Sequence, residues 1–325
     1  MQVSIIIPTY NRFAQLLVCL DNLAKQTYPL DQYGVVVVDD GSTDETPDVA
    51  KAKYPFSLMY CRQRNQGSAA ARNHGVQHSQ GAVLIFLDDD VLVGQEFVAA
   101  IVQAHLNSER AIVTGTFRSP LTPPCTIFQM IGIDRSSDDT KGDRSSLSFT
   151  EVTSNNVSVK RPDFLALGMW QDVAGDGQTL WGDVDFAYRA YKRGFSFRRA
   201  PNAICYHDDY ATRDLAAASR RAEIAARRAV LLFQRYPELI EYLPMFRDKT
   251  PVVWGQDSFG LSCRKLMRYA ASTRLSIRCL VITARWLEEH FLSPRLLRPL
   301  YRWIIGGYIF RGYRQGLREL KGASI

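Results

Sequence analysis

Short apolar runs alternate with longer segments of helical periodicity over the first third of this 325-residue chain. The apolar runs are rich in β-branched residues and are typical of buried strands. We predict strands at residues 3–8, 35–40, 57–61 and 83–88, and helices at residues 13–26, 46–54, 68–79 and 95–106. Strands that alternate with helices form a mostly parallel sheet with helices on both faces, so the sequence predicts an α/β fold.

The pattern changes twice further along the chain. Residues 117–150 are rich in Ser, Asp, Pro and Gly. They predict a long loop, which is either a mobile lid or a solvated surface insertion. Strand and helix patterns then return, and from residue 211 onward the pattern is helical. We therefore predict an α/β domain at residues 1–210 and a helical extension at residues 211–325.

The extension contains an apolar stripe at helical spacing over residues 295–310, with arginines beside it. Such a stripe is typical of an interfacial helix on an anionic membrane surface. It is equally typical of a helix that packs onto the α/β domain or a second subunit. The longest uninterrupted apolar run there, residues 303–310, is well below the ~18 residues of a membrane span.

Charge and cysteine content narrow the cellular setting. Residues 1–209 carry 19 Lys/Arg and 24 Asp/Glu, whereas residues 210–325 carry 21 and 9. The basic extension has no recognised nucleic-acid motif, so we expect no nucleic-acid partner. Six cysteines without a CxxC pair predict free thiols in a reducing compartment. The start of the sequence shows no secretory signal. We predict a cytoplasmic protein, peripheral at the inner face of the membrane if the stripe binds lipid.

Aspartates gather after the predicted strands or at the start of a predicted helix. They form four groups, Asp39/Asp40, Asp88/Asp89/Asp90, Asp183/Asp185 and Asp208/Asp209. One such pair alone is typical of a helix cap or a strand-end turn. Four groups at the carboxyl edge of one sheet, where ligands bind in such folds, favour a site with a bound cation. Oxygen ligands of this kind suit Mn²⁺ or Mg²⁺.

Seven short motifs make the resemblance to a known family specific. In chain order they read VSIIIPTYNR, VVVVDDGSTDET, NQGSAAARNHGV, GAVLIFLDDDV, SNNVSVKR, WGDVDFAYRAYKRG and CYH. This order resembles the family 2 glycosyltransferases of the GT-A fold over roughly residues 1–210. The resemblance implies a GT-A (nucleotide-diphospho-sugar transferase) Rossmann-like sheet. It also implies inverting transfer of a sugar from a nucleotide-sugar donor to an acceptor hydroxyl.

The resemblance also implies residue roles. Donor-binding residues would be Pro8, Thr9, Tyr10, Asp39, Asp40, Arg72, Asp88 and Asp89, and metal ligands would be Asp90 and His207. Asp183 would be the catalytic base, with Asp185 as a weaker candidate. Gly182 departs from the family pattern, in which Glu is common at this position. Asn156 and Trp181 would border the acceptor.

The predicted activity is transfer of one sugar. By resemblance, UDP-sugars are the expected donors, and GDP and dTDP sugars are left open. Processive family members carry Gln-x-x-Arg-Trp, but Ile282 and Pro299 stand at the Gln positions here. The acceptor would be a glycan or a lipid-linked glycan. A nucleotidyltransferase is one alternative, although PTYNRFAQ lacks the Gly-rich phosphate loop expected of it. The other alternative is a non-catalytic nucleotide-sugar binding protein. The intact set of acids argues against it.

Overall fold

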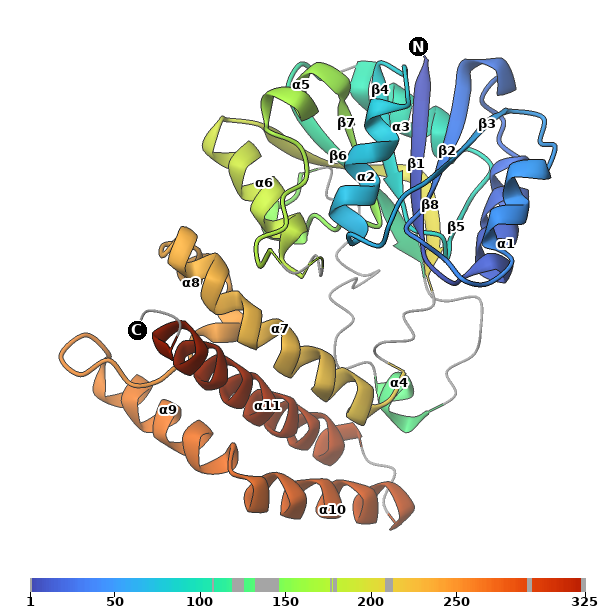
Figure 1. Ribbon diagram of the computed structural model, residues 1–325. Coiled ribbons are helices and arrows are strands. Elements are labelled where there is room, and N and C mark those ends of the chain that lie inside the picture. The colour runs from blue at the N-terminus through green and yellow to red at the C-terminus, as the bar shows by residue number, and fades with distance from the viewer. Residues whose placement is uncertain are drawn as a thin grey trace. The chain divides into compact units, whose positions relative to one another are not determined.

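The computed structural model describes residues 2–106, 108–118, 126–131, 146–175, 177, 180–207, 213–290 and 294–322 (Figure 1). The chain divides into two compact units. The first comprises Met1–Leu121 and Ser137–Asp208, and the second comprises Thr122–Ser136 and Asp209–Ile325. The second unit thus includes a short segment, Thr122–Ser136, that lies in the chain between the two parts of the first unit.

The first unit is built on one eight-stranded sheet, which confirms the α/β prediction. Its strands are β1 Val3–Thr9, β2 Tyr33–Asp39, β3 Ser57–Arg62, β4 Val83–Leu87, β5 Val91–Val93, β6 Ala111–Arg118, β7 Asn156–Lys160 and β8 Ser196–His207. Their order is β3-β2-β1-β4-β7-β6-β8-β5. Strands β3, β2, β1 and β4 run parallel, and so do β6 and β8, while β7 and β5 pair antiparallel with their neighbours.

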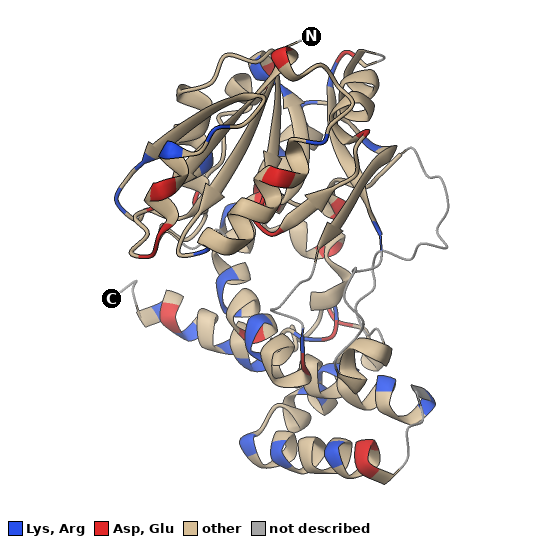
Figure 2. Ribbon diagram, turned by 90° about the vertical axis from the view of Figure 1, so that its right-hand side faces the viewer, with Lys and Arg blue, Asp and Glu red and all other residues tan. Residues whose placement is uncertain are grey.

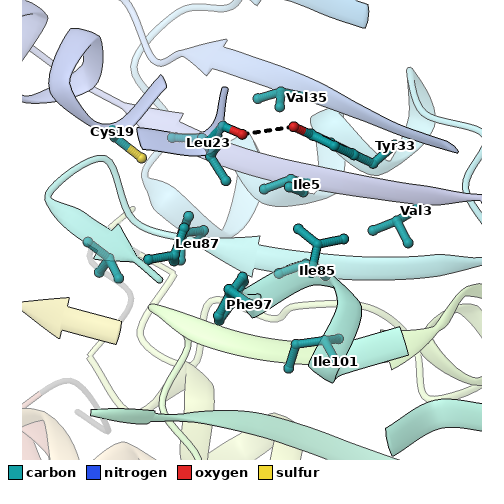
Figure 3. Packing of buried hydrophobic residues seen from close by; sticks show 14 of the residues in the cluster. Val3, Ile5, Cys19, Leu23, Tyr33, Val35, Ile85, Leu87, Phe97 and Ile101 are labelled. Carbon is teal, nitrogen blue, oxygen red and sulfur yellow. Dashed lines mark hydrogen bonds between the residues drawn. The ribbon is translucent and has the colours of Figure 1, made fainter. Parts of the chain in front are cut away.

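Helices cover both faces of this sheet, as predicted. They are α1 Phe13–Leu23, α2 Ser68–Gln77, α3 Phe97–Leu106, α5 Arg161–Ala166 and α6 Gly182–Lys192. Because side chains alternate along a strand, Ile5 and Ile85 point to one face, where they pack with α1 and α3 (Figure 3). The next residue on β4, Phe86, points to the other face and contacts Phe164 and Trp170.

One predicted helix is wrong in kind. Residues 46–54 were expected to form a helix, but only Thr46–Lys51 is helical, and as a 3₁₀ helix. Pro47 lies in its first turn and lacks the N–H that a following α-helical turn would use. Pro55 restricts Tyr54 to extended backbone, so the segment cannot continue as a helix.

The predicted loop at residues 117–150 is only partly described. Residues 119–125 and 132–145 lie outside the described residues, so neither the lid nor the insertion is tested. Inside this range a short helix, α4 Ile127–Ile131, belongs to the second unit, and a 3₁₀ turn, η3 Phe149–Glu151, belongs to the first. All five cysteines in the described part of the chain are free thiols, as expected.

The second unit is helical, and its lysines and arginines outnumber its acids (Figure 2). Besides α4 it contains α7 Leu215–Arg235, α8 Leu239–Tyr242, α9 Phe259–Ala271, α10 Arg274–His290 and α11 Pro294–Gly322. Helix α11 lies between α7 and the α9–α10 pair (Figure 1). None of the helices described is both long and apolar enough to cross a bilayer.

The apolar stripe on α11 is largely internal to the second unit. Leu297, Tyr301 and Ile304 are fully buried and pack with Phe128 of α4 and Ala218 of α7. The stripe is therefore buried by packing, but its partners are helices of its own unit, which were not predicted from the sequence. The buried part of the stripe presents no face to a membrane.

Candidate active site

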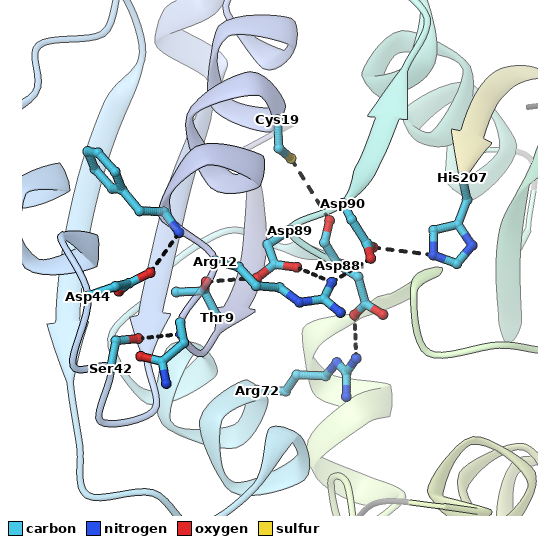
Figure 4. Close-up of polar contacts among 12 residues, drawn as sticks. Thr9, Arg12, Cys19, Ser42, Asp44, Arg72, Asp88, Asp89, Asp90 and His207 are labelled. Carbon is cyan, nitrogen blue, oxygen red and sulfur yellow. Dashed lines mark hydrogen bonds and ion pairs between the residues drawn. The ribbon is translucent and has the colours of Figure 1, made fainter. Parts of the chain in front are cut away.

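Three aspartates follow β4 at the carboxyl edge of the sheet, where β1 and β2 also end (Figure 4). The first of them, Asp88, donates its backbone N–H to the carbonyl of Asn155 at 3.3 Å. Strand β5 begins directly after the third and pairs with the end of β8, so that Val91 lies opposite His207. This pairing brings His207 next to Asp90 although 117 positions separate them.

Asp90 and His207 face each other. His207 Nε2 lies 3.3 Å from Asp90 Oδ1, and Arg12 Nη1 lies 2.5 Å from Asp90 Oδ2. Burial raises the pKa of the Asp90 carboxyl, but His207 and Arg12 together outweigh burial and hold the pKa below its ordinary value. Asp90 is therefore a carboxylate with cationic or polar neighbours on both oxygens.

Asp89 turns away from His207 and into the protein. Its carboxylate accepts a hydrogen bond from Thr9 Oγ1 at 2.7 Å and lies 3.2 Å from Arg12 Nη1. Burial raises the pKa of Asp89 to about 6, against the opposing effects of Thr9 and Arg12. These contacts tie the segment after β4 to the end of β1, so Asp89 mainly holds the local architecture.

Asp88 pairs with Arg72, which projects from α2. Arg72 Nη2 lies 2.6 Å from Asp88 Oδ1, and the guanidinium carbon lies 5.8 Å from the ring centre of Trp170. Arg72 is only 4% exposed, yet its Nε has no hydrogen-bond partner in the described part of the chain. The side-chain oxygen of Asn155 is buried and unpaired in the same sense. Buried polar atoms without a partner are rare in native structures, and a water or a ligand commonly completes their hydrogen bonding.

The two acids after β2 are buried and well partnered. Asp39 accepts hydrogen bonds from the Ser42 backbone N–H at 2.7 Å and from Tyr60 Oη at 2.6 Å. Asp40 accepts from the backbone N–H groups of residues 66 and 67 at 2.9 and 2.8 Å. Gly67, at φ 88°, is the residue that precedes α2. Asp40 thus fixes the turn that begins the helix carrying Arg72.

The segment after β1 lies against the segment after β2. Pro8 is buried within β1, whereas Tyr10 is 47% exposed just beyond it. Asn11, at φ 53°, accepts a hydrogen bond from the Thr43 backbone N–H at 2.7 Å and donates its own N–H to Ser42 Oγ at 2.9 Å. Asn tolerates the left-handed region better than most residues, so it can hold this turn.

Asp183 and Asp185 occupy different environments in the first turn of α6. Asp183 is half-buried, and its carboxylate accepts the backbone N–H of Val184 at 2.9 Å. Asp185 is fully buried and forms an ion pair with Arg189 at 2.7 Å. This pairing removes Asp185 as a candidate base and leaves Asp183. Trp181, immediately before α6, has φ 72°, a strained value for a bulky residue.

Asn156 is more deeply buried than Trp181, the other residue predicted to border the acceptor. It is 1% exposed, accepts the Gly115 backbone N–H at 3.1 Å and donates to Cys205 Sγ at 2.9 Å. These contacts join β6, β7 and β8. They give Asn156 a structural role between these strands, and its predicted place at the border of the acceptor stays a prediction.

The residues present suit a cation that takes few protein ligands. Within the described residues no group of three or more His, Cys, Asp or Glu side chains forms a metal cage. Asp90 and His207 face each other as two candidate ligands, and Mg²⁺ commonly fills its remaining positions with phosphate and water oxygens. Asp208 and Asp209 lie outside the described residues.

Sequence reasoning missed two residues of this site. Arg12 bridges Asp89 and Asp90, and Asn155 accepts the backbone N–H of Asp88 with its carbonyl and has a buried, unpaired side-chain oxygen. A signal for Arg12 was available, because it follows the first strand within PTYNR and is the nearest cation in the sequence to that strand end. Asn155 had no such signal.

A sheet with acids and a buried arginine at its carboxyl edge is typical of an α/β protein that binds a ligand at that edge. Residues 4–145 match the model of the family described as Glycosyl transferase family 2. Glycosyltransferase AglE of Haloferax volcanii is 42% identical over 102 residues, which are 30% of this chain and 33% of that protein. The match thus spans about a third of that relative's length.

Two solved structures share the fold along nearly the whole chain. Mannosyltransferase PcManGT from Pyrobaculum calidifontis, in complex with GDP-Man and Mn²⁺, has a TM-score of 0.60 at 20% identity and covers 98% of this chain and 87% of its own. S. aureus TarS 1–349, in complex with UDP, has a TM-score of 0.52 at 17% identity and covers 99% and 92%. The family resemblance is confirmed for residues 4–145, which match the family 2 glycosyltransferases, and the chain shares the GT-A fold of the solved structures.

Proposed function

We propose that the first unit transfers a single sugar from a nucleotide-diphosphate sugar to an acceptor hydroxyl, with inversion at the anomeric carbon. The observation that carries this proposal is the convergence of Arg72, Asp88, Asp90 and His207 at one edge of the sheet. The unpaired Nε of Arg72 is a donor that a phosphate or ribose oxygen would satisfy. A sugar diphosphate supplies such oxygens.

The proposed donor is a UDP-sugar, and GDP and dTDP sugars are the alternatives. Structures of similar fold are described in complex with UDP and with GDP-Man, which supports a nucleotide-sugar at this edge. The proposed donor-binding residues are Pro8, Thr9, Tyr10, Asp39, Asp40, Arg72, Asp88 and Asp89. Those that are already saturated by protein contacts would shape the pocket rather than contact the donor.

Asp90 and His207 are the proposed ligands of Mn²⁺ or Mg²⁺. When bound, the ion would supply positive charge that offsets the charge on the departing nucleotide diphosphate. The structural relative PcManGT is described with Mn²⁺, in line with this assignment. Arg12, paired with Asp90, supplies a permanent positive charge at the same place.

Asp183 is the proposed base. The acceptor oxygen would form a bond to the anomeric carbon from the face opposite the donor phosphate, and Asp183 would take the acceptor proton. The bond between that carbon and the phosphate oxygen breaks, and its electron pair leaves with the nucleotide diphosphate. Trp181, adjacent to Asp183 in the chain, is the proposed border of the acceptor site.

The Asp183→Asn variant tests this assignment. The amide keeps the size of the side chain but cannot take a proton, so turnover should fall by at least about a hundredfold. Donor binding, measured by calorimetry, should stay close to wild type. Asp48→Asn, an exposed acid of the same unit, is the matched control and should keep full turnover. Near wild-type turnover in Asp183→Asn would remove Asp183 as the base.

A donor panel identifies the reaction class and the nucleotide together. UDP-, GDP- and dTDP-sugars would be tested for binding and slow hydrolysis with Mn²⁺, with Mg²⁺ and with a chelator. The proposal predicts that one donor binds and that its binding depends on metal. Binding without hydrolysis or transfer under all conditions would favour a non-catalytic nucleotide-sugar binding protein.

The proposed acceptor is a hydroxyl of a glycan or a lipid-linked glycan, in the cytoplasm or at the inner face of the membrane. The buried stripe of α11 does not support membrane contact. Exposed apolar residues on α10 do, namely Leu275, Ile282 and Trp286 at 74%, 66% and 50% exposure. Arginines lie beside them on the same helix, which favours an anionic membrane surface.

A further inference from the structure

The second unit contains a cavity of about 490 Å³ that is separate from the edge of the sheet described above. It is lined by α7, the end of α9, the start of α10 and the last turns of α11. Four arginines face it, Arg274, Arg311, Arg314 and Arg318, together with a single carboxylate, that of Glu223. Its volume is that of a small-molecule site.

The spacing of the arginines on α11 follows from helical geometry. Arg311, Arg314 and Arg318 stand at i, i+3 and i+7, which places them on one side of the helix. Gly312 and Gly316 lie beside this row and touch α7. A methyl group built on them would lie 2.1 Å from the Glu223 carbonyl oxygen and 2.2 Å from that of Arg227. The close approach of the two helices fixes the arginine row in place.

The positive charge of the cavity is only partly balanced. Arg311 forms a two-pronged pair with Glu223, at 2.5 and 2.6 Å, and Arg314 lies 4.6 Å from the ring centre of Tyr269. In the described part of the chain no carboxylate lies within ion-pair distance of Arg274 or Arg318. Three more positive than negative groups therefore line the cavity.

The start of α10 adds to this positive potential. Thr273 Oγ1 accepts the backbone N–H of Ser276 at 3.2 Å, so Thr273 caps a helix of 17 residues. Thr273 and Arg274 both line the cavity, which therefore lies at the positive end of the helix dipole. Crowded like charges raise the free energy of the empty cavity, and a multivalent anion would lower it.

We propose that this arginine cavity binds a phosphate-bearing ligand whose group carries at least two negative charges. Arginine favours phosphate because its planar fork matches two phosphate oxygens at once. A diphosphate or a phosphate monoester fits the charge and the volume. The ligand is either a soluble phosphorylated sugar or the phosphomonoester headgroup of a lipid. The inference does not rest on the proposed transfer reaction of the first unit.

The probe for this binding is inorganic pyrophosphate. It is added to the full chain in a metal-free buffer that contains a chelator. The chelator suppresses metal-dependent binding in the first unit. The wild-type chain should bind pyrophosphate, and the Arg274→Ala/Arg318→Ala variant should bind at least about tenfold more weakly, because two charge-assisted contacts are lost. Both side chains are exposed, so the variant should keep the wild-type circular dichroism and thermal unfolding.

Arg278→Ala/Arg285→Ala is the matched control, because it removes two exposed arginines of α10 outside the cavity lining. It should bind pyrophosphate as the wild type does. Equal loss in both double variants would indicate attraction by overall charge and would overturn the proposal. The proposal would also be overturned if Arg274→Ala/Arg318→Ala bound pyrophosphate as the wild type does, or if the wild type did not bind pyrophosphate.

Vesicles separate the two sources of phosphate. If the ligand is a lipid headgroup, vesicles with phosphatidic acid should displace pyrophosphate from the wild-type chain, and vesicles of phosphatidylcholine alone should not. If the ligand is soluble, phosphorylated sugars should displace pyrophosphate and neither vesicle should. Donor binding with metal, measured in parallel, reports on the first unit, so failure of one proposal is distinguishable from failure of the other.

Discussion

Charge compensation at single residues holds the carboxylate cluster together. Three consecutive aspartates would repel one another in a half-buried position. Arg72 pairs with Asp88, and Arg12 contacts both Asp89 and Asp90, so two guanidinium groups balance them before any ligand binds. The cluster can therefore fold without a metal ion and still leave Asp90 beside His207.

A buried histidine outside the carboxylate cluster makes stability depend on pH. His105 on α3 is fully buried, and its Nε2 lies 2.9 Å from Ser158 Oγ, whose hydrogen bond to the Val113 carbonyl leaves it to accept from His105. Its Nδ1 has no partner in the described part of the chain, so protonation would bury an unpaired N–H. Burial, aided by the charge of Lys160, lowers the pKa of His105 to about 4.

We predict that acid destabilises the protein through His105. The unfolded histidine binds a proton below about pH 6.5, whereas the folded one stays neutral until about pH 4, so the free energy of unfolding falls as pH falls between these values. The loss should be roughly 2–3 kcal/mol. His105→Gln keeps a donor to Ser158 but does not titrate. Urea unfolding near neutral pH and at about pH 4.5 should show a smaller pH effect in the variant.

Other groups, such as Asp89, titrate in both proteins and cancel in the comparison of His105→Gln with wild type. The two proteins would show the same pH dependence if His105 were not responsible.

The sequence predicts which residues end the strands but not which side chains they meet. The order of motifs was enough to expect His207 near Asp90, and their separation of 3.3 Å agrees with that expectation. The hydrogen-bond partners of Asn156 could not be predicted, because Gly115 and Cys205 are 41 and 49 positions away on neighbouring strands. A polar residue at a strand end looks the same in the sequence whether it faces solvent or another strand.

At the scale of elements, the sequence predicted β1, β2, β3 and β4 to within two residues of their ends, whereas β5 and β6 were not predicted. It predicted helix ends less well. Helix α1 ends at Leu23 and not at residue 26, and the segment after β2 forms a 3₁₀ helix. Prolines and local backbone contacts decide such ends, and apolar periodicity does not register them.

The contact between α7 and α11 depends on glycine in a way that a mutation can test. Gly316→Ala should gain helix propensity of about 1 kcal/mol, but its methyl group would lie 2.2 Å from the Arg227 carbonyl oxygen. We predict a net destabilisation of roughly 1–3 kcal/mol, because the helices must separate to admit the methyl group. Thermal unfolding followed by far-UV circular dichroism measures it.

Gly322→Ala is the control on the same helix, since nothing lies within 4 Å of a methyl group there. It should leave the unfolding temperature unchanged or raise it slightly. If Gly316→Ala and Gly322→Ala had the same unfolding temperature, the α7–α11 contact would not require glycine at position 316.

At the scale of the whole molecule, charge is divided along the chain. The net charge is −5 over residues 1–209 and +12 over residues 210–325. The acids that serve the proposed reaction belong to the first unit, and the arginine cavity belongs to the second. The division was readable from the sequence, but the cavity was not, because it requires α7, α9, α10 and α11 to pack around one space.

The basic second unit also carries exposed apolar side chains. Leu275, Ile282 and Trp286 stand at i, i+7 and i+11, which places them on one side of α10, and Arg274 and Arg285 lie next to Leu275 and Trp286 in the chain. An exposed apolar row with arginines beside it suits an anionic lipid surface, where the rings and aliphatic groups enter the interface and the guanidinium groups meet phosphate.

We predict that the full chain co-sediments with anionic vesicles of phosphatidylglycerol and phosphatidylcholine at low salt, and does so less as salt increases. Ile282→Glu/Trp286→Glu should reduce binding by at least about tenfold, because each change removes apolar burial worth roughly 1.5–3 kcal/mol and adds repulsion. Leu165→Glu, an equally exposed apolar position of the first unit, should bind as the wild type does. If the wild type does not co-sediment at low salt, or if the double variant binds as well as Leu165→Glu, α10 has no membrane role and the acceptor must be reached from solution.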